Sequence, residues 1–414
     1  MKHHVAIHPP ARPVSVSIQL PNSKSISNRV LVMAALCGER HKLSALAASD
    51  DTLRLDRALN EEQTTIDCGD GGTTLRFALA WAAIQKGEER LITGGKRLLE
   101  RPHDPLIEAL RSLGAEIGKS PEGFQVTGKE LNGGEVEFRS PVSSQYISAL
   151  LMIAPYMSDG LRIHWKGDRL SGPYVRMTLG LMRHFGATVK MDDDVIEVEA
   201  GGYSPVNFIV PCDWSAAAFW YEIVAIIPGS RVLLIGLFDD GIQGDVAARR
   251  LWDRWVITEQ NNEGTFLRHR SDTLSTTGLE FELQDTPDLF QPLALTCAAR
   301  GADAIFTGLD NLPLKETDRL AATARILQQL GAESGYHEGT FKLPAWDLVP
   351  SSAHDLPVLD PDGDHRMAMS IAPLAGLISG LRIADPYVVR KSYPAYWDHL
   401  QLAGFKVEQA VTSG

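Results

Sequence analysis

The feature that most constrains this chain is a repeated helix ending. At four places an amphipathic helical segment stops at a glycine and an extended segment follows, as in ALRSLGAEI and RILQQLGAES. Glycine suits the residue after a helix because it adopts the left-handed conformation without strain. The intervals between these glycines are 72, 145 and 73 residues, so the middle interval is close to twice the other two. The glycines are Gly114, Gly186, Gly331 and Gly404.

The doubled interval predicts a further, degenerate copy near its midpoint, and the segment RRLWDRWVITEQ (residues 249–260) lies there without its glycine. A weaker copy is LRLDRALNEEQTTID (residues 53–67). A chain of 414 residues therefore divides into six units of about 70 residues, each with strands and helices, which indicates an α/β fold. We expect two domains of three units, formed by residues 1–20 plus 211–414 and by residues 21–210, with an active site in the cleft between them.

Several helix starts combine small, hydroxyl and cationic residues. PNSKSISNR (residues 21–29) brings Lys24, Ser25 and Arg29 to the first turns of a helix. The first backbone N–H groups of a helix lack internal partners and the helix dipole is positive there, so such a start can bind an anion. One such stretch is more often a capped, solvated helix end. Five further starts repeat the pattern and indicate an anionic ligand: GDGGTTLR, SPVSSQYIS, LPLKETDRL, GDHRMAM and VRKSYP, the last with Arg390 and Lys391.

Composition excludes several functional classes. The formal net charge of −12 argues against a general nucleic-acid binder. No run of 18 apolar residues is present, so we expect no membrane span, and the start of the chain lacks the apolar core of a signal peptide. The four cysteines form no CxxC pair, which argues against zinc and fits a cytoplasmic protein. We therefore expect small anionic substrates and no metal.

Eight motifs resemble those of the EPSP synthase (3-phosphoshikimate 1-carboxyvinyltransferase) family, in the family's order and over nearly the whole chain. They are SKSISNR, GDGGTTLR, RPHDPLIEALRSLGA, SSQYISALL, SGPYV, KETDRL, DHRMAM and RKSYP. The resemblance implies a two-domain inverse α/β barrel with six βαβαββ repeats, three per domain. It also implies transfer of the enolpyruvyl group of phosphoenolpyruvate (PEP) to the 5-hydroxyl of shikimate 3-phosphate, in the route to chorismate and the aromatic amino acids. No cofactor is implied, and we expect a monomer.

The resemblance also assigns roles to residues. Those implied in acid–base chemistry are Lys24, Asp288 and Glu316, with His365 beside them. Those implied in binding shikimate 3-phosphate are Lys24, Ser25, Arg29, Ser143, Ser144, Gln145, Ser171, Tyr174, Asp288, Asn311 and Lys315. Those implied in binding PEP are Lys24, Gly72, Thr73, Arg101, Gln145, Arg319, Arg366 and Lys391.

The residue types fit this chemistry on their own. Both substrates carry a phosphate and a carboxylate, which arginine binds through two parallel hydrogen bonds and lysine as a point charge. The reaction needs a base for the attacking hydroxyl, for which Asp288 is the candidate. It also needs an acid that protonates the PEP methylene carbon, for which Glu316, helped by Lys24, is the candidate.

The chain departs from the family at two points. Asn22 replaces the usual glycine, and asparagine tolerates the same left-handed turn. The usual loop GNAGT is GDGGT here, so Asp70 places a carboxylate beside an expected anion site and should weaken PEP binding.

Three alternative functions stay open. UDP-N-acetylglucosamine enolpyruvyl transferases share the fold and the donor but use a loop cysteine, which residues 94–104 lack. A non-catalytic, ligand-binding paralogue would not need Lys24 and Glu316. The RNA-cyclase relatives of this fold are disfavoured by the acidic net charge.

Overall fold

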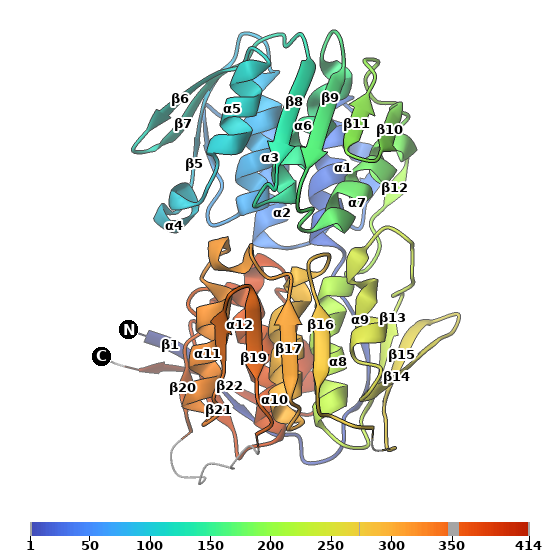
Figure 1. The fold of residues 1–414 in the computed structure, drawn as a ribbon, viewed down its shortest axis with the longest axis vertical. Coiled ribbons are helices and arrows are strands. Elements are labelled where there is room, and N and C mark those ends of the chain that lie inside the picture. Colours follow the sequence, from blue (N-terminus) through green and yellow to red (C-terminus); the bar gives the residue numbers. More distant parts are fainter. Residues whose placement is uncertain (1, 273, 347–355, 413–414) are drawn as a thin grey trace. The chain divides into compact units, whose positions relative to one another are not determined.

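The computed structural model describes residues 2–272, 274–346 and 356–412 (Figure 1). By its internal contacts the chain divides into two compact units. One consists of Met1–Pro21 and Pro211–Gly414, and we call it the terminal unit. The other is Asn22–Val210, and we call it the inserted unit. Among the described residues, no helix combines the length and the apolar character needed to span a membrane.

The inserted unit contains three sheets, each with one parallel pair of strands. The first has the order β4 (Thr65–Asp67), β5 (Glu89–Thr93), β7 (Gly123–Thr127), β6 (Glu116–Ser120). The second has the order β8 (Gly134–Arg139), β9 (Leu161–Lys166), β11 (Val195–Val198), β10 (Val189–Asp192). The third is the parallel pair β3 (Leu43–Ser44) and β12 (Phe208–Ile209). The helices are α1 (Lys24–Leu36), α2 (Asp50–Asn60), α3 (Gly72–Ala83), α4 (Lys96–Glu100), α5 (Asp104–Ser112), α6 (Ser144–Ile153) and α7 (Gly172–His184).

The terminal unit contains three four-stranded sheets of the same kind. The first has the order β2 (Ser15–Gln19), β13 (Arg231–Ile235), β15 (Gly264–His269), β14 (Val256–Gln260). The second has the order β16 (Leu279–Glu282), β17 (Ala304–Thr307), β19 (Thr340–Leu343), β18 (Gly335–His337). The third has the order β20 (Val358–Leu359), β21 (Leu381–Ala384), β1 (Lys2–His8), β22 (Lys406–Thr412). The helices are α8 (Trp214–Ile226), α9 (Ala248–Leu251), α10 (Phe290–Ala299), α11 (Arg319–Gln329), α12 (His365–Ile371) and α13 (Tyr396–Leu402).

The sheets repeat one pattern of pairing. In each four-stranded sheet one edge strand pairs in parallel with its neighbour, and the two remaining pairs are antiparallel, as in β8–β9, β9–β11 and β11–β10. The last sheet keeps the pattern although its two final strands, β1 and β22, come from the opposite ends of the chain. Five of the six sheets follow this pattern, and the sixth, β3–β12, has only the parallel pair. The predicted α/β fold is therefore confirmed, with one of the six repeats reduced.

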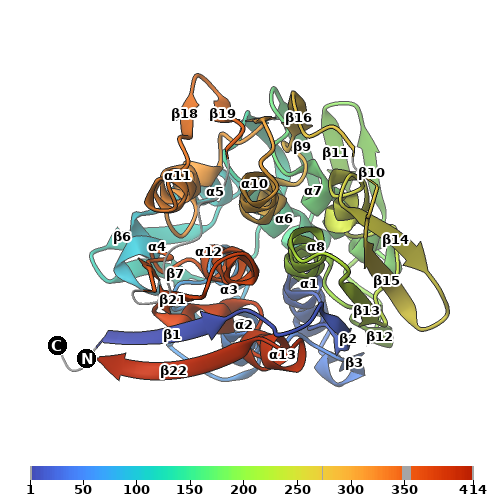
Figure 2. The ribbon, with the colours of Figure 1, turned by 90° about the horizontal axis from the view of Figure 1, so that it is seen from below.

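The core of each unit is built on helices that are buried on nearly all sides. In the terminal unit α8, α10 and α12 pack together, and the strands lie around them (Figure 2). The sequence of α8, WSAAAFWYEIVAI, is apolar over most of its circumference, and all thirteen of its residues are buried. A helix that is apolar all round belongs inside a protein, which explains why helices rather than strands fill the centre. In the inserted unit α1, α3 and α6 pack together in the same way.

The repeated glycines adopt the conformation that the sequence predicts. Their φ angles are positive, at 103°, 84°, 93° and 93° for Gly114, Gly186, Gly331 and Gly404. The degenerate copy is also a helix followed by a strand, but its helix α9 has only four residues. One expectation was wrong: Arg390 and Lys391 do not start a helix. They end the 3-10 helix Pro386–Lys391, and α13 begins only at Tyr396.

Candidate active site

In the inserted unit the predicted site residues lie in the first two turns of α1, α3, α6 and α7, except Arg101, which follows the end of α4. Ser23 caps α1 and Ser143 caps α6, and each side-chain oxygen accepts a backbone N–H of the helix that it precedes. Ser171 precedes α7 in a left-handed conformation with φ of 60°. Ser25 is the second residue of α1, and Ser144 is the first residue of α6. The inserted unit therefore contains several helix N-termini, each with a partial positive charge that favours an anion.

Lys24, the first residue of α1, forms an ion pair with Asp51 of α2. The distance between Lys24 Nζ and Asp51 Oδ2 is 3.0 Å, and both side chains are largely buried. The backbone carbonyl of Asp51 also accepts a hydrogen bond of 2.9 Å from the hydroxyl of Thr74 in α3. Asp51 therefore holds the lysine ammonium of α1 close to the first turns of α2 and α3.

The glycines of GDGGT leave room for charged side chains. A Cβ atom at Gly72 would lie 2.6 Å from Nη1 of Arg101, so the guanidinium packs directly on the backbone of that residue. A Cβ atom at Gly71 would lie 2.9 Å from Asp51 Oδ1 and 2.7 Å from Thr74 Oγ1. Because only glycine avoids these overlaps, the backbone of the loop can lie directly against Arg101, Asp51 and Thr74.

Gln145 connects α6 to α3. Its side-chain amide donates to Thr73 Oγ1 at 3.0 Å, and its side-chain oxygen accepts from Arg76 Nη1 at 2.6 Å. Arg76 also donates to the carbonyl of Pro102, the residue after Arg101. The predicted PEP-side residues Gly72, Thr73, Arg101 and Gln145 are therefore brought together in the inserted unit.

Arg29 is buried one turn further along α1. It donates through Nε to Thr178 Oγ1 at 2.7 Å and through Nη2 to Ser148 Oγ and the carbonyl of Tyr174, both at 3.2 Å. Nη1 donates to the carbonyl of Ser25 at 2.8 Å. Burial among these oxygens lowers the pKa of Arg29 to about 10. The guanidinium is thus held by hydroxyl and carbonyl oxygens, which leaves its positive charge available for a ligand anion.

In the terminal unit the predicted site residues gather around Arg319. This arginine is the first residue of α11 and is 2% exposed. Burial alone would lower the pKa of Arg319, but the three surrounding carboxylates outweigh it and hold that pKa above its usual value. The carboxylate oxygens lie at 2.7 Å from Nε, 2.8 Å from Nη1 and 3.1 Å from Nη2, and they belong to Asp364, Asp288 and Glu316.

The same carboxylates bind further predicted cations. Glu316 Oε1 lies 2.7 Å from Lys391 Nζ, and Asp288 Oδ2 lies 2.9 Å from Arg366 Nη2. Lys315 Nζ is more distant, at 3.9 Å from Asp288 Oδ1. Burial alone would raise the pKa of Asp288, but these cations outweigh it and hold that pKa well below its usual range. Lys391 thus joins the cluster although it does not start a helix.

The remaining predicted residues of the terminal unit lie on neighbouring turns. Asn311 is buried directly before the 3-10 helix Leu312–Leu314 and Lys315. His365 is the first residue of α12 and is 1% exposed, and its Nδ1 lies 3.7 Å from Asp364 Oδ1. Asp364 caps α12 by accepting the backbone N–H of Arg366 at 2.8 Å.

Two aspartates of these clusters were not predicted as site residues. Asp51 stands in ASDDT, where two acids at a helix start indicate only a favourable interaction with the helix dipole. Asp364 stands before His365 at a position typical of a helix cap, and it does cap α12. In both cases the position at a helix start already explains the aspartate. The sequence therefore does not indicate that the same carboxylate also orients a cation from another part of the chain. Only the spatial contact with Lys24 or Arg319 reveals it.

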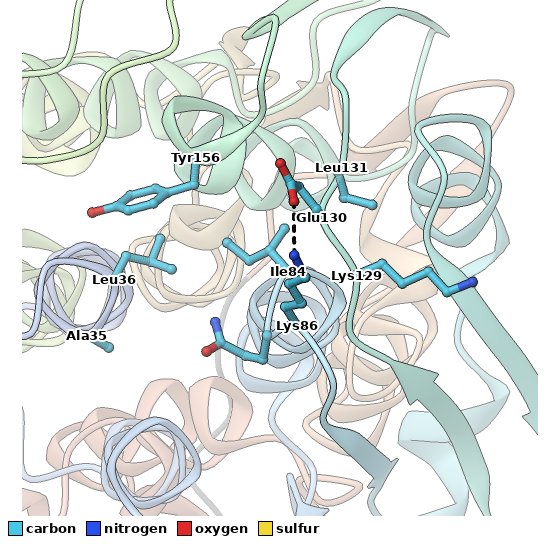
Figure 3. A pocket seen from close by; sticks show the side chains of 9 residues that line it. Ala35, Leu36, Ile84, Lys86, Lys129, Glu130, Leu131 and Tyr156 are labelled. Atoms are coloured by element: carbon cyan, nitrogen blue, oxygen red, sulfur yellow. Dashed lines mark hydrogen bonds and ion pairs between the residues drawn. The ribbon is translucent and has the colours of Figure 1, made fainter.

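A pocket of about 280 Å³ in the inserted unit lies away from the predicted site residues (Figure 3). Its lining includes Leu36 at the end of α1, Ile84 after α3 and Tyr156, with the Lys86–Glu130 ion pair of 3.2 Å across it. A thirteen-residue helix is about 20 Å long, so this pocket lies about one helix length from Lys24. It contains none of the predicted residues. Among the described residues, no group of three or more histidines, cysteines, aspartates or glutamates could hold a metal ion.

Comparisons with known proteins bear on the family and the fold. The family model described as EPSP synthase (3-phosphoshikimate 1-carboxyvinyltransferase) matches residues 54–400. A 3-phosphoshikimate 1-carboxyvinyltransferase of Bacteroides fragilis is 39% identical over 400 residues, which cover 95% of this chain and 97% of the relative. One from Methanoculleus marisnigri is 31% identical over 419 residues, covering 94% and 96%. The structure of EPSP synthase from Acinetobacter baumannii matches with a TM-score of 0.76 at 20% identity, covering 99% of this chain and all of that one.

Proposed function

The chain belongs to the EPSP synthase family, and from that premise we propose how its residues divide the work of the reaction. The enzyme transfers the enolpyruvyl group of PEP to the 5-hydroxyl of shikimate 3-phosphate and releases phosphate. The hydroxyl oxygen bonds to C2 of PEP while C3 gains a proton. The C2–O bond to phosphate then breaks and C3 loses a proton, which gives the enolpyruvyl ether.

One observation carries the proposal. Two carboxylates, Asp288 and Glu316, share Arg319 and are each bound to a second cation at 2.9 Å or less. The anions of PEP can take the place of these carboxylates on the cations, because phosphate and carboxylate accept the same charge-assisted hydrogen bonds. A carboxylate that loses its cations gains affinity for a proton. Substrate binding would therefore turn two paired, inert acids into groups that accept and donate protons.

The roles follow from these contacts. Asp288 accepts the proton of the attacking hydroxyl, and Glu316, released from Lys391 and Arg319, delivers a proton to C3 of PEP. Lys24, oriented by Asp51, binds the anions and assists the proton transfer, and His365 lies beside these groups. PEP binds to Lys24, Gly72, Thr73, Arg101, Gln145, Arg319, Arg366 and Lys391. Shikimate 3-phosphate binds to Lys24, Ser25, Arg29, Ser143, Ser144, Gln145, Ser171, Tyr174, Asp288, Asn311 and Lys315.

We further propose that the two units act as two domains, residues 1–20 plus 211–414 and residues 21–210. Each carries cations for only part of the substrate anions, which supports binding in a cleft that both domains form and that excludes water when it closes. We also propose that the protein is a cytoplasmic monomer. Its four cysteines form no disulfide, which is usual in a reducing compartment.

The test is a phosphate-release assay with three mixtures: PEP with shikimate 3-phosphate, PEP with UDP-N-acetylglucosamine, and PEP alone. We expect phosphate release only in the first mixture. Release in the second would indicate a UDP-N-acetylglucosamine enolpyruvyl transferase. No release in any mixture, from a protein that melts cooperatively, would indicate a non-catalytic paralogue. Sedimentation of the same sample measures the oligomeric state.

A further inference from the structure

Lys391 lies in a segment that hydrogen bonds fix on both sides of it. The 3-10 helix that Lys391 ends begins at Pro386, whose carbonyl accepts a hydrogen bond of 2.8 Å from the indole of Trp397. After the helix, the backbone N–H of Tyr393 donates to the carbonyl of Val389 at 2.8 Å. The backbone at Lys391 is therefore enclosed by the turn that joins Val389 to Tyr393.

The side chain of Tyr393 connects this turn to two α-helices. Tyr393 is 1% exposed, and its hydroxyl lies 3.2 Å from the indole nitrogen of Trp220 in α8 and 2.7 Å from Nδ1 of His399 in α13. An indole N–H can only donate, so the phenol oxygen accepts from Trp220. The phenol donates its own proton to Nδ1 of neutral His399. The opposite direction would leave this buried proton without an acceptor among the described residues.

Aromatic packing holds the phenol ring in this place. The ring centroid of Tyr393 lies 5.4 Å from that of Tyr396 and 5.5 Å from that of His399, both in edge-on geometry. Tyr396 packs on Phe219 of α8 at 5.9 Å, and its hydroxyl donates to the carbonyl of Met369 in α12 at 2.7 Å. Such edge-on contacts fix the orientation of a ring. The hydroxyl of Tyr393 can therefore be removed without removing the ring that fills the core.

The position of Lys391 matters because its ammonium reaches the carboxylate cluster. Its Nζ lies 2.7 Å from Oε1 of Glu316, and both side chains are largely buried. The 3-10 helix that ends at Lys391 also packs against α12, which carries Arg366 in its first turn. A misplacement of about 1 Å in a group that meets substrate can cost on the order of 100-fold in rate. A loosened turn around Lys391 would therefore be felt at the site.

We propose that Tyr393 and His399 are positioning residues of the reaction, which hold the backbone of Lys391 so that its ammonium meets the anions of PEP. The phenol does this by bonding at once to Trp220 of α8 and to His399 of α13. This inference rests on the proposed function. It gives a role to two residues to which the family resemblance assigns none.

The geometry also makes the contact sensitive to acid. A protonated imidazole carries a proton on Nδ1 and no longer accepts from the phenol, so the contact exists with neutral His399 and is lost when His399 takes up a proton. Burial lowers the pKa of His399, and the neighbouring Asp398 opposes that shift. The contact is therefore lost as the pH falls through a pKa below the usual value of about 6.5.

The other ionisable groups around this contact keep their state in that pH range. Burial raises the pKa of the Tyr393 phenol, and Cys212 and Asp213 act in the same direction, so the phenol stays protonated. The strand β22 packs against α13, and its Lys406 and Glu408 form an ion pair with each other at 2.8 Å. His399 is thus the group whose protonation changes the contact.

The first test is Tyr393→Phe, which keeps the ring and removes the hydroxyl. We expect the KM for PEP to rise by about 3-fold to 10-fold at pH 7.5, as for the loss of one hydrogen bond, while the KM for shikimate 3-phosphate stays at the wild-type value. Tyr387→Phe is the matched control, because Tyr387 belongs to the same 3-10 helix but is exposed, and it should behave as the wild type. Phosphate release at varied substrate concentration measures both constants.

The second test compares two variants of His399. Asparagine offers an oxygen in place of Nδ1 and accepts from the phenol at every pH, whereas leucine offers no acceptor. At pH 7.5 we expect His399→Asn to resemble the wild type and His399→Leu to resemble Tyr393→Phe. Between pH 7.5 and pH 5, the KM for PEP of the wild type should rise relative to that of His399→Asn. This ratio cancels the ionisation of the substrates' own phosphates, which occurs near pH 6.

The inference is overturned if Tyr393→Phe keeps the wild-type KM for PEP, or if the KM for shikimate 3-phosphate rises by the same factor, as in a general loosening of the fold. Equal constants for His399→Asn and His399→Leu, or a ratio that does not change with pH, would overturn it as well. If Tyr393→Phe does not melt cooperatively, the two His399 variants decide. Failure of the wild type to release phosphate from PEP and shikimate 3-phosphate would instead contradict the proposed function.

Discussion

The two units carry cations of the same kind but partner them differently. In the inserted unit, the guanidinium of Arg29 is bound by the hydroxyls of Thr178 and Ser148 and by backbone carbonyls. In the terminal unit, the guanidinium of Arg319 is bound by three carboxylates within 3.1 Å. Burial lowers the pKa of Arg29, whereas the carboxylates outweigh burial and raise the pKa of Arg319. The same residue type is therefore an uncompensated charge in one unit and a neutralised one in the other.

This difference suggests a division of labour. An arginine held by neutral oxygens attracts an anion without first breaking an ion pair, which suits the binding of shikimate 3-phosphate. An arginine held by carboxylates must exchange them for substrate, and the released carboxylates become able to transfer protons. The inserted unit would thus mainly bind, and the terminal unit would mainly catalyse. The following variants test that division, in the order of their expected effect.

The largest effect is expected from Glu316→Gln. Glutamine keeps the size of the side chain and can still accept hydrogen bonds from Arg319 and Lys391, but it cannot deliver a proton. We expect kcat to fall by about 10²- to 10⁴-fold, the usual contribution of general acid–base catalysis, while the KM for shikimate 3-phosphate changes little. Steady-state phosphate release, with melting curves to confirm the fold, measures this.

Lys24→Ala extends this test to the inserted unit. It removes both an anion contact and the partner of Asp51, so we expect kcat to fall by orders of magnitude as well. A near-normal rate in either variant would remove that residue from the mechanism. A loss in Lys24→Ala as large as in Glu316→Gln would show that the inserted unit also takes part in the chemistry, and the division would be less sharp.

A smaller effect, on binding, is expected from Arg29→Lys. Lysine keeps the charge but cannot donate to Thr178, Ser148 and two carbonyls at once, because its donors share one nitrogen. We expect the KM for shikimate 3-phosphate to rise by about 10-fold to 100-fold, since hydrogen bonds to charged groups contribute roughly 1.5–3 kcal/mol, while kcat stays close to the wild type. Arg162→Lys, at an exposed position of strand β9, is the control. A fall in kcat without a change in KM would contradict the binding role.

The buried helices α1 and α8 of the two units also differ, and this difference affects the stability of the fold. Aligning the starts of α1 and α8 places Glu222 where α1 has Val32, and both residues are buried. Within the described part of the chain, neither carboxyl oxygen of Glu222 has a hydrogen-bond partner, and burial raises the pKa of Glu222 well above its usual value. A protonated acid in this position stabilises the fold fully only below the unfolded pKa of about 4.3. As the pH rises from there toward the raised folded pKa, this contribution is lost.

Glu222→Gln should therefore raise the free energy of unfolding by about 1–3 kcal/mol at pH 8 and by less at pH 4.5. Urea unfolding at both pH values measures the effect. Glu280→Gln, an exposed residue of β16, is the control. Equal effects at the two pH values would show that the side chain does not titrate between them, and a destabilised variant would show that the carboxyl has a partner in solution.

Much of the fold was predictable because short sequence motifs within the repeats indicate where helices begin and end. A serine before an apolar helix marks its start, as in SKSISNR at α1, and a glycine after a helix marks its end, as in RSLGA at α5. Lys391 shows where local reasoning fails. A proline three residues later excludes the preceding residue from a helix, which delays α13 to Tyr396. The structure brings Lys391 to 2.7 Å from Glu316, but the lysine ends a 3-10 helix and does not start an α-helix as predicted.

The paired carboxylates were not predictable in the same way. Asp364 caps its own helix, and this satisfies every local requirement before the contact with Arg319 is known. A residue that orients a distant side chain can be predicted from the sequence only when its partner lies nearby in the sequence.

The smallest effect is expected at Asp70, the carboxylate of the GDGGT loop. The side chain is exposed and lies against Gly95, where any Cβ would overlap its Oδ1. Asp70→Asn keeps this packing and removes one negative charge near the expected PEP anions, so the KM for PEP should fall by roughly twofold at low salt. Because exposed charges are screened, the difference should vanish at high ionic strength. Gly95→Ala is the contrasting variant, since it displaces Asp70 by overlap and should act independently of salt. An unchanged KM for Asp70→Asn at low salt would show that the charge of this carboxylate does not affect PEP binding. The replacement of the family's asparagine by Asp70 would then leave the binding role of the inserted unit unchanged.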